Sequence, residues 1–373
     1  MKNKQKNIII TTFLVAALLF SVSRSFAANG GVSASYLYNL SNFSGEIPYQ
    51  LGILFADKKN NEIYVIDRQG RDVTVFNDKG MEIYRFGDEG ELGSVLDGAV
   101  DPDGNILLLL YRRVSQNVFK YLVLKCDFRG RPVSEIEFID FPPEFSAFAP
   151  DRLVLRDNRL YLAQLGAMQV AVINEKGRFL KGYNLLPMLE LSEEKKKKVL
   201  TGMFGFTVDR EGNLLFTVPG LFHAFRMSPD EKITTFGLAG SGPGKFGIVS
   251  GITTDDRGYI YVSDRLRCVV LVFGNSLQFQ TEFGYRGYGK GNLIIPASLA
   301  VDAEGRLYVS QAANRGVSVF QITETSGTDR SKVSINSRKE VMDQGARTMS
   351  LEKGKTLASS SGTAHPPKKV NPS

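Results

Sequence analysis

The stretch Gly251-Ile-Thr-Thr-Asp-Asp-Arg-Gly-Tyr-Ile-Tyr-Val-Ser-Asp264 recurs 47 residues later as Ser298-Leu-Ala-Val-Asp-Ala-Glu-Gly-Arg-Leu-Tyr-Val-Ser-Gln311. Each copy consists of an apolar strand, an Asp-x-x-Gly turn and a second strand built on Leu or Ile, Tyr and Val. A chain that repeats such a unit is an array of small sheets. The repeat therefore predicts an all-β architecture, and the number of copies decides which one.

Six copies of this unit can be counted along the chain. Their turn markers are Asn61, Gly104, Asn158, Gly212, Gly258 and Gly305, separated by 43, 54, 54, 46 and 47 residues. Each copy is followed by a second hairpin, such as Val123 to Gly130, so a unit holds four strands. The spacing is typical of four-stranded propeller blades, and we predict a six-bladed β-propeller over residues 28–323.

The most regular residues of the repeat have a structural interpretation. A carboxylate that begins a tight turn can accept backbone N–H groups within it, and the glycine supplies a positive φ. We assign these turn roles to Asp101, Gly104, Asp209, Gly212, Asp255, Gly258, Asp302 and Gly305.

The sixth unit ends early, at Val317 to Ile322, and lacks a fourth strand. A spare strand, Ala34 to Leu40, precedes the first unit. We predict that it pairs with the last blade and closes the ring, which removes exposed sheet edges. The alternative is an unpaired N-terminal arm.

The glycine-rich segments between units resemble those of the NHL-repeat family of six-bladed propellers. Gly240 to Phe246, followed by Gly251 to Asp255, is similar to that family's inter-blade link and first strand, and Gly287 to Gly291 repeats the link. The family's Asp-x-x-Asn-x-Arg-Val element survives in part, as Asp264 in one copy and Asn314 in another. The resemblance implies the propeller fold and a habit of binding partners, and it implies no single activity.

The two ends of the chain differ from the repeats. Residues 1–27 have a basic start, a short apolar stretch and small residues before Ala28, as in a secretory signal peptide cleaved after Ala27. The alternative, an uncleaved anchor helix, has a stretch that is short for a span. We expect export to the periplasm or the medium, with no transmembrane span in the mature chain. Residues 324–373 form a basic tail, rich in Ser, Thr, Gly, Lys and Pro, that we expect to be disordered.

The formal charge of +7 resides in these ends. The first 27 residues carry +4 and residues 325–373 carry +5, which leaves the propeller at about −2. This distribution speaks against nucleic-acid binding. We expect the partner to be another envelope or extracellular protein.

One segment interrupts the β pattern. Residues 188–201 contain good helix formers with acids ahead of bases, which predicts a short surface helix between blades three and four. Lys195 and Lys196 on this helix are either a docking patch or a solvated face.

The sequence offers little to support catalysis by histidine, zinc or haem. Only His223 and His365 are present, and Cys126 and Cys268 fall in blades on opposite sides of the ring, so we expect no disulfide. Gly240 to Lys245 departs from a phosphate loop at two positions, and the link explains its glycines. We expect no cofactor.

Two functions remain. The one we favour is a non-enzymatic scaffold that binds a protein or glycan through its loops, with Tyr285, Arg286 and Tyr288 as candidate contacts; alternatively, these residues only fill the link. The other is a calcium-dependent, lactonase-like hydrolase at the channel mouth, with Asp97 and Asp151 as the available carboxylates.

Overall fold

The computed structural model describes residues 31–67, 72–87, 92–116 and 118–325. Residues Val32–Thr323 form one compact unit. The expected signal peptide and the tail beyond residue 325 lie outside the described residues. Among the residues that are described, no helix is long and apolar enough to cross a membrane.

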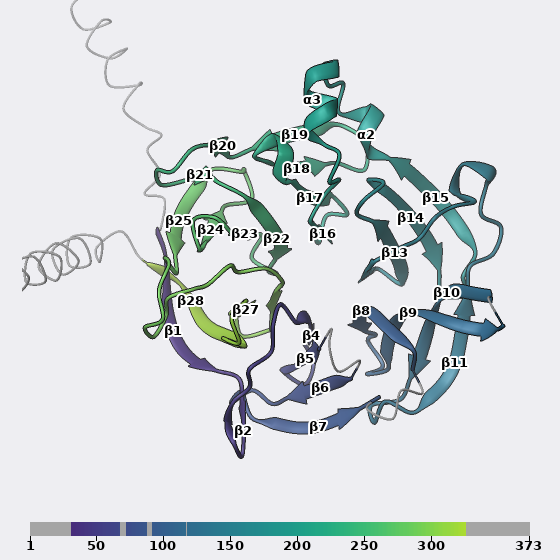
Figure 1. The fold of residues 1–373 in the computed structure, drawn as a ribbon, viewed down its shortest axis with the longest axis horizontal. Helices are drawn as coiled ribbons and strands as arrows, with labels where there is room; N and C mark the ends of the chain where they lie inside the picture. The colour runs from purple at the N-terminus through teal and green to yellow at the C-terminus, as the bar shows by residue number, and fades with distance from the viewer. Residues whose placement is uncertain (1–30, 68–71, 88–91, 117, 326–373) are drawn as a thin grey trace, which may run out of the picture. The chain divides into compact units, whose positions relative to one another are not determined.

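Six four-stranded antiparallel sheets are arranged around a common centre, which confirms the six-bladed β-propeller (Figure 1). Figure 1 shows the first strand of each blade innermost and the fourth at the rim. Blades 1 to 3 are β4 (Ile53–Asp57), β5 (Glu62–Ile66), β6 (Val73–Phe76), β7 (Glu82–Phe86); β8 (Ser94–Val100), β9 (Ile106–Ser115), β10 (Val118–Cys126), β11 (Pro132–Glu137); and β12 (Arg152–Arg156), β13 (Arg159–Gln164), β14 (Gln169–Asn174), β15 (Phe179–Asn184). Blades 4 and 5 are β16 (Gly205–Val208), β17 (Leu214–Val218), β18 (His223–Met227), β19 (Ile233–Phe236); and β22 (Val249–Thr254), β23 (Ile260–Asp264), β24 (Val269–Phe273), β25 (Phe279–Phe283).

The sixth blade is completed from the other end of the chain. It consists of β26 (Leu299–Val301), β27 (Arg306–Ser310), β28 (Val317–Thr325) and, as its outer strand, β1 (Gly31–Asn39). The Leu40 amide donates to the Val317 carbonyl at 2.9 Å, and the Ser318 hydroxyl donates to Asn39 Oδ1 at 2.7 Å. The predicted closure is therefore confirmed.

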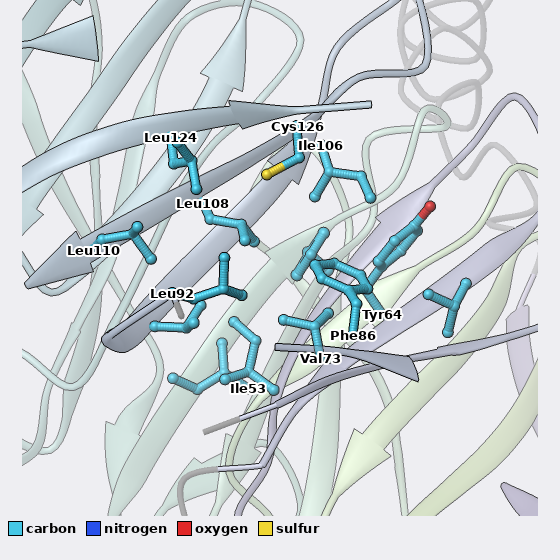
Figure 2. Close-up of a cluster of buried hydrophobic side chains, with 14 of the residues drawn as sticks. Ile53, Tyr64, Val73, Phe86, Leu92, Ile106, Leu108, Leu110, Leu124 and Cys126 are labelled. Atoms are coloured by element: carbon cyan, nitrogen blue, oxygen red, sulfur yellow. The ribbon is translucent and has the colours of Figure 1, made fainter. Parts of the chain in front are cut away.

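The hydrophobic core is divided among the blade interfaces. Six clusters of buried side chains correspond to the six pairs of neighbouring blades. Figure 2 shows the cluster between blades 1 and 2, where Tyr64 and Phe86 of one blade meet Leu108 and Leu110 of the next. Leu107 and Leu109 of the same strand belong to the cluster with blade 3. Because both faces of β9 are buried, its sequence is a continuous apolar run instead of an alternating one.

The antiparallel strands define two faces of the ring. The turns between strands 1 and 2 and between strands 3 and 4 share one face, which we call the turn face. The turns between strands 2 and 3, and the ends of the links that enter each first strand, share the opposite one, the link face.

The repeated aspartates belong to the turn face. Asp255 Oδ1 accepts the amides of Arg257 and Tyr259, at 3.1 and 2.9 Å, and its Oδ2 accepts the hydroxyl of the buried Tyr261 at 2.9 Å. Gly258 in this turn has a φ of 89°. Asp101, Asp209 and Asp302 accept turn amides in the same way, and Gly104, Gly212 and Gly305 also have positive φ. These carboxylates hold the hairpins together.

The segment between blades 3 and 4 contains two short helices, α2 (Leu185–Met188) and α3 (Glu193–Lys198), where we expected one. Glu190 adopts a φ of 47° and Ser192 is extended, so the helical path breaks between them. Leu185 and Val199 are buried against blades 3 and 4, and anchoring both ends of the segment on the core prevents one straight helix. The minor elements are the 3-10 helices η1 (Pro143–Phe145) and η2 (Pro219–Leu221) and the strand pairs β2 (Ser41–Asn42) with β3 (Gly45–Glu46) and β20 (Leu238–Ala239) with β21 (Lys245–Phe246).

Candidate functional site

The centre of the ring holds a cavity of about 800 Å³, lined by the first strands of all six blades. Its wall runs from Leu51 and Arg152 at the link face to Lys58 and Asp157 at the turn face. This volume is within the range of small-molecule sites. The central channel is therefore the main candidate for a ligand-binding or catalytic site.

Asp97 lies in the channel wall, as the sequence predicted, but its carboxylate is already engaged. Oδ1 accepts the Gly98 amide and Oδ2 accepts the Leu153 amide of blade 3, each at 2.9 Å. Ser298 does the same between blades 6 and 1, where its hydroxyl accepts the Leu54 amide at 3.1 Å. Asp97 thus joins two neighbouring blades, and this supports a structural role.

Burial raises the pKa of Asp97 from its ordinary 3.8 to about 6, against the opposing effects of Arg152 and the two backbone N–H donors. The folded state therefore holds a proton more tightly than the unfolded state. The resulting stabilisation is present below about pH 4 and is lost as the pH rises through about 6.

We accordingly expect the unfolding free energy of the wild type, relative to Asp97→Asn, to fall by about 2.4 kcal/mol between pH 4 and pH 7. Urea unfolding of both proteins across this range measures the difference, because the other carboxylates contribute equally to both. A difference that stayed constant or rose with pH would contradict this assignment.

The calcium alternative depends on the carboxylates near the channel mouth. Asp151 Oδ1 accepts the Leu165 amide at 3.3 Å, so this carboxylate too is engaged by backbone. Calcium takes six to eight oxygen ligands, usually with several carboxylates. In the described part of the chain, no three His, Cys, Asp or Glu side chains lie together as a metal site requires. The donor set around Asp97 and Asp151 does not fit a calcium ion.

Two arginines that the sequence analysis overlooked line the link-face end of the channel. Arg152 begins β12, and Arg265 directly follows β23. Within residues 31–67, 72–87, 92–116 and 118–325, neither guanidinium group has a hydrogen bond or an ion pair. The sequence contained one indication of Arg152: a charged residue begins this channel-lining strand, whereas blade 4 has Gly205 at the start of the corresponding strand. The position of Arg265 could be recognised only from the fold.

The cations at the opposite mouth are engaged. Lys58 pairs with Asp256 of blade 5 at 2.6 Å, and Lys59 donates to the Pro102 carbonyl at 3.3 Å. Arg156 donates to the Val208 carbonyl of the next blade at 3.2 Å. These three cations of the turn-face mouth are therefore engaged by groups of the chain itself.

Tyr285, Arg286 and Tyr288 lie on the link face, on the loop between blades 5 and 6. The two tyrosines are 55% and 73% exposed, and the neighbouring Leu266 is 54% exposed. Arg286 donates to the Leu266 carbonyl at 3.2 Å. The Arg315 guanidinium lies 5.9 Å from the centre of the Tyr288 ring. The loop is thus braced and presents its aromatic rings to solvent.

Lys195 and Lys196 lie on α3, which packs against η2 of blade 4. Both are exposed, and Lys196 pairs with Glu193 one turn earlier at 2.7 Å. The exposed Leu200 follows this helix, and Phe222 follows η2. Further residues of the same link, Thr201 and Met203, line the channel.

His223 is half-buried in the propeller, and its two cysteines are buried. His223 Nδ1 lies 2.9 Å from the Gly237 carbonyl. Cys126 and Cys268 are buried and free, and burial raises the pKa of the Cys126 thiol to about 12. The Cys126 thiol is therefore protonated, and unreactive as a nucleophile, at neutral pH.

Comparison with known proteins identifies the fold. No protein-family profile matches the chain, and no curated protein matches it. Among solved structures, a protein of unknown function from Bacteroides thetaiotaomicron aligns with a TM-score of 0.55 at 14% identity, covering 78% of this chain and 76% of that one. A gluconolactonase from Xanthomonas campestris aligns with a TM-score of 0.52 at 13% identity, covering 81% and 94%. A streptogramin B lyase aligns with a TM-score of 0.51 at 14% identity, covering 79% and 98%. At these identities the likeness shows a shared β-propeller fold and leaves the activity open.

Proposed function

We propose that the protein is an exported, non-enzymatic propeller that binds a protein partner of the cell envelope or extracellular space through its link face. The observation that carries this proposal is the presence of exposed apolar side chains on several 2–3 turns and links of this face. They include Leu200, Phe222, Leu266, Tyr285 and Tyr288. Exposed aromatic and aliphatic side chains on rigid loops are typical of protein interfaces.

Two further features support binding over catalysis. The carboxylates expected to hold calcium, Asp97 and Asp151, accept backbone amides. The loop that carries Tyr285 and Tyr288 is held by its own hydrogen bonds, since the Leu293 amide donates to the Tyr285 carbonyl at 2.9 Å. A preorganised loop loses little entropy on binding, which favours affinity. The resemblance to NHL-repeat propellers agrees with this role.

The test compares two triple variants as baits for crosslinked capture from the native envelope fraction. We expect Leu266→Ser, Tyr285→Ser and Tyr288→Ser together to lose the partner captured by the wild type, because interface aromatic residues carry much of the binding energy. A control with Phe128→Ser, Val133→Ser and Leu180→Ser removes exposed apolar groups elsewhere and should retain it.

Equal capture by both triple variants would contradict the proposal. A rise in Tm with millimolar calcium that Asp97→Asn abolishes would favour the hydrolase instead. Both measurements use the full propeller, and near-UV circular dichroism confirms that each variant is folded.

A further inference from the structure

On the link face of blades 5 and 6, exposed apolar residues lie among cations. We propose that this surface binds a short acidic segment of a protein, in which Asp or Glu residues stand beside apolar ones. The inference rests on the proposed function, and it adds the chemistry of the partner and the position of the contact.

Four chain segments form this surface, which we call the basic patch. They are residues 244–248, 264–268, 282–293 and 311–317. The amide of Arg265 in the second segment donates to the carbonyl of Ile248 in the first at 2.8 Å. Arg286 in the third donates to the carbonyl of Leu266 in the second at 3.2 Å. Arg315 in the fourth donates to a carbonyl of the third at 3.5 Å. Successive segments are in contact, so the basic patch is one continuous surface.

The charges of the basic patch are predominantly positive. Its cations are Lys245, Arg265, Arg267, Arg286, Lys290 and Arg315, and its acids are Asp264 and Glu282. Asp264 is fully buried and accepts backbone amides, and Glu282 pairs with Arg267. Within the described residues, the other five cations pair with no carboxylate. The net charge of the basic patch is +4, and the charges left to meet a partner are all cationic.

An acid outside the four segments also acts near the basic patch. Burial raises the pKa of Tyr36, Glu46 raises it further and Arg315 lowers it, so Glu46 and Arg315 act on the same hydroxyl. The Glu46 carboxylate accepts a hydrogen bond from Asn39 Nδ2 at 2.8 Å. Counting Glu46 lowers the net charge to +3 and leaves the sign unchanged.

Exposed apolar side chains lie between these cations. Ile248, Leu266, Tyr285 and Tyr288 are 37%, 54%, 55% and 73% exposed. The Arg315 guanidinium lies over the Tyr288 ring, which keeps a cation beside an aromatic side chain. A partner that complements this surface must therefore offer apolar side chains as well as negative charge.

A short acidic protein segment meets both requirements. The planar guanidinium fork pairs with both oxygens of a carboxylate, and neighbouring apolar residues of the segment would cover the exposed rings. A long polyanion such as a nucleic acid fits less well, because the rest of the propeller carries a net charge of about −6 and repels it.

The experiment selects a phage-displayed library of random peptides on the whole immobilised protein. We expect the selected peptides to be enriched in Asp and Glu next to aromatic or aliphatic residues. A selected peptide should bind in fluorescence anisotropy, and its Asn and Gln analogue should bind about tenfold more weakly or worse, since charged hydrogen bonds are lost. Added salt should also weaken binding of the acidic peptide.

Two double variants place the contact. Arg286→Glu with Lys290→Glu reverses two exposed charges of the basic patch and should weaken binding of the acidic peptide by about tenfold or more. Lys79→Glu with Lys176→Glu makes the same change in net charge on the turn face, where both lysines are exposed, and should leave binding unchanged. Urea unfolding of both variants shows whether each is folded.

Several outcomes would overturn the inference: selection of no peptide, selection of neutral or basic peptides, equal binding by the two double variants, or equally tight binding of single-stranded DNA. Crosslinked capture separates this failure from that of the proposed function. A partner lost by the Leu266, Tyr285 and Tyr288 variant but kept by the Arg286 and Lys290 variant would overturn the inference alone. Capture of no partner by the wild type would overturn both.

Discussion

Removal of residues 31–40 is expected to destabilise the propeller by more than about 5 kcal/mol. This segment supplies β1, the outer strand of blade 6, and the buried Val32 and Leu40. Its loss also exposes the edge of β28, which provides unpaired N–H and C=O groups for association with another chain. Urea unfolding should show a lower midpoint, and light scattering should show association that increases with protein concentration.

Two point variants separate side-chain burial from the loss of the strand. Leu40 is 1% exposed and packs between blades 6 and 1, so Leu40→Ala should cost about 2–5 kcal/mol. Leu37 lies three residues earlier, on β1, but is 41% exposed, and Leu37→Ala should change stability by less than about 0.5 kcal/mol. Equal effects of the two variants would show that the strand does not close the ring as described.

Glu282→Ala is expected to destabilise the protein by about 3–5 kcal/mol, because it leaves the Arg267 charge buried without its carboxylate. The side chains of Glu282 and Arg267 are 5% and 11% exposed. The two terminal nitrogens of Arg267, Nη1 and Nη2, both donate to the Glu282 carboxylate. Glu282 Oε2 also accepts the Gly244 amide at 3.1 Å, which ties the link between blades 4 and 5 to blade 5. Thermal and urea unfolding measure the effect.

The double variant Arg267→Met, Glu282→Leu removes both charges together. It should recover much of the loss, because the penalty of the single variant comes from the partner left behind. Glu193→Ala breaks the exposed pair with Lys196 and should cost less than about 1 kcal/mol. If the Glu282 and Glu193 variants had similar effects, the Arg267–Glu282 pair would not be buried as described.

The blade count was predictable because its signals are local. An aspartate, a turn glycine and a strand with Tyr lie within about ten residues, and a turn such as Asp255 to Tyr261 forms from its own residues. Closure by residues 34–40 was also predictable, since the sixth unit visibly lacked a strand and the N-terminus had one to spare.

The candidate site was less predictable because its residues come from different blades. The sequence placed Asp97 at the channel but gave no indication that Leu153, 56 residues later, would occupy its carboxylate. It predicted one helix after blade 3, where anchoring of both ends on the core gives two. In the sequence Arg265 has no feature that distinguishes it from other turn residues, and only the fold shows that it lies in the cavity wall.

The sequence by itself determined the repeat, the strands and their closure into a ring, because each depends on residues close together in the chain or on a simple count. Only the tertiary structure decided which charges are engaged and which are available. Asp97 lies within β8 and Arg152 begins the adjacent channel strand β12, yet Asp97 contacts the backbone of the next blade while Arg152 is left without a hydrogen-bonding partner among the described residues. The physical reason is that hydrogen bonding across a blade interface depends on strand register and on the residues of the neighbouring blade. The local sequence pattern determines neither.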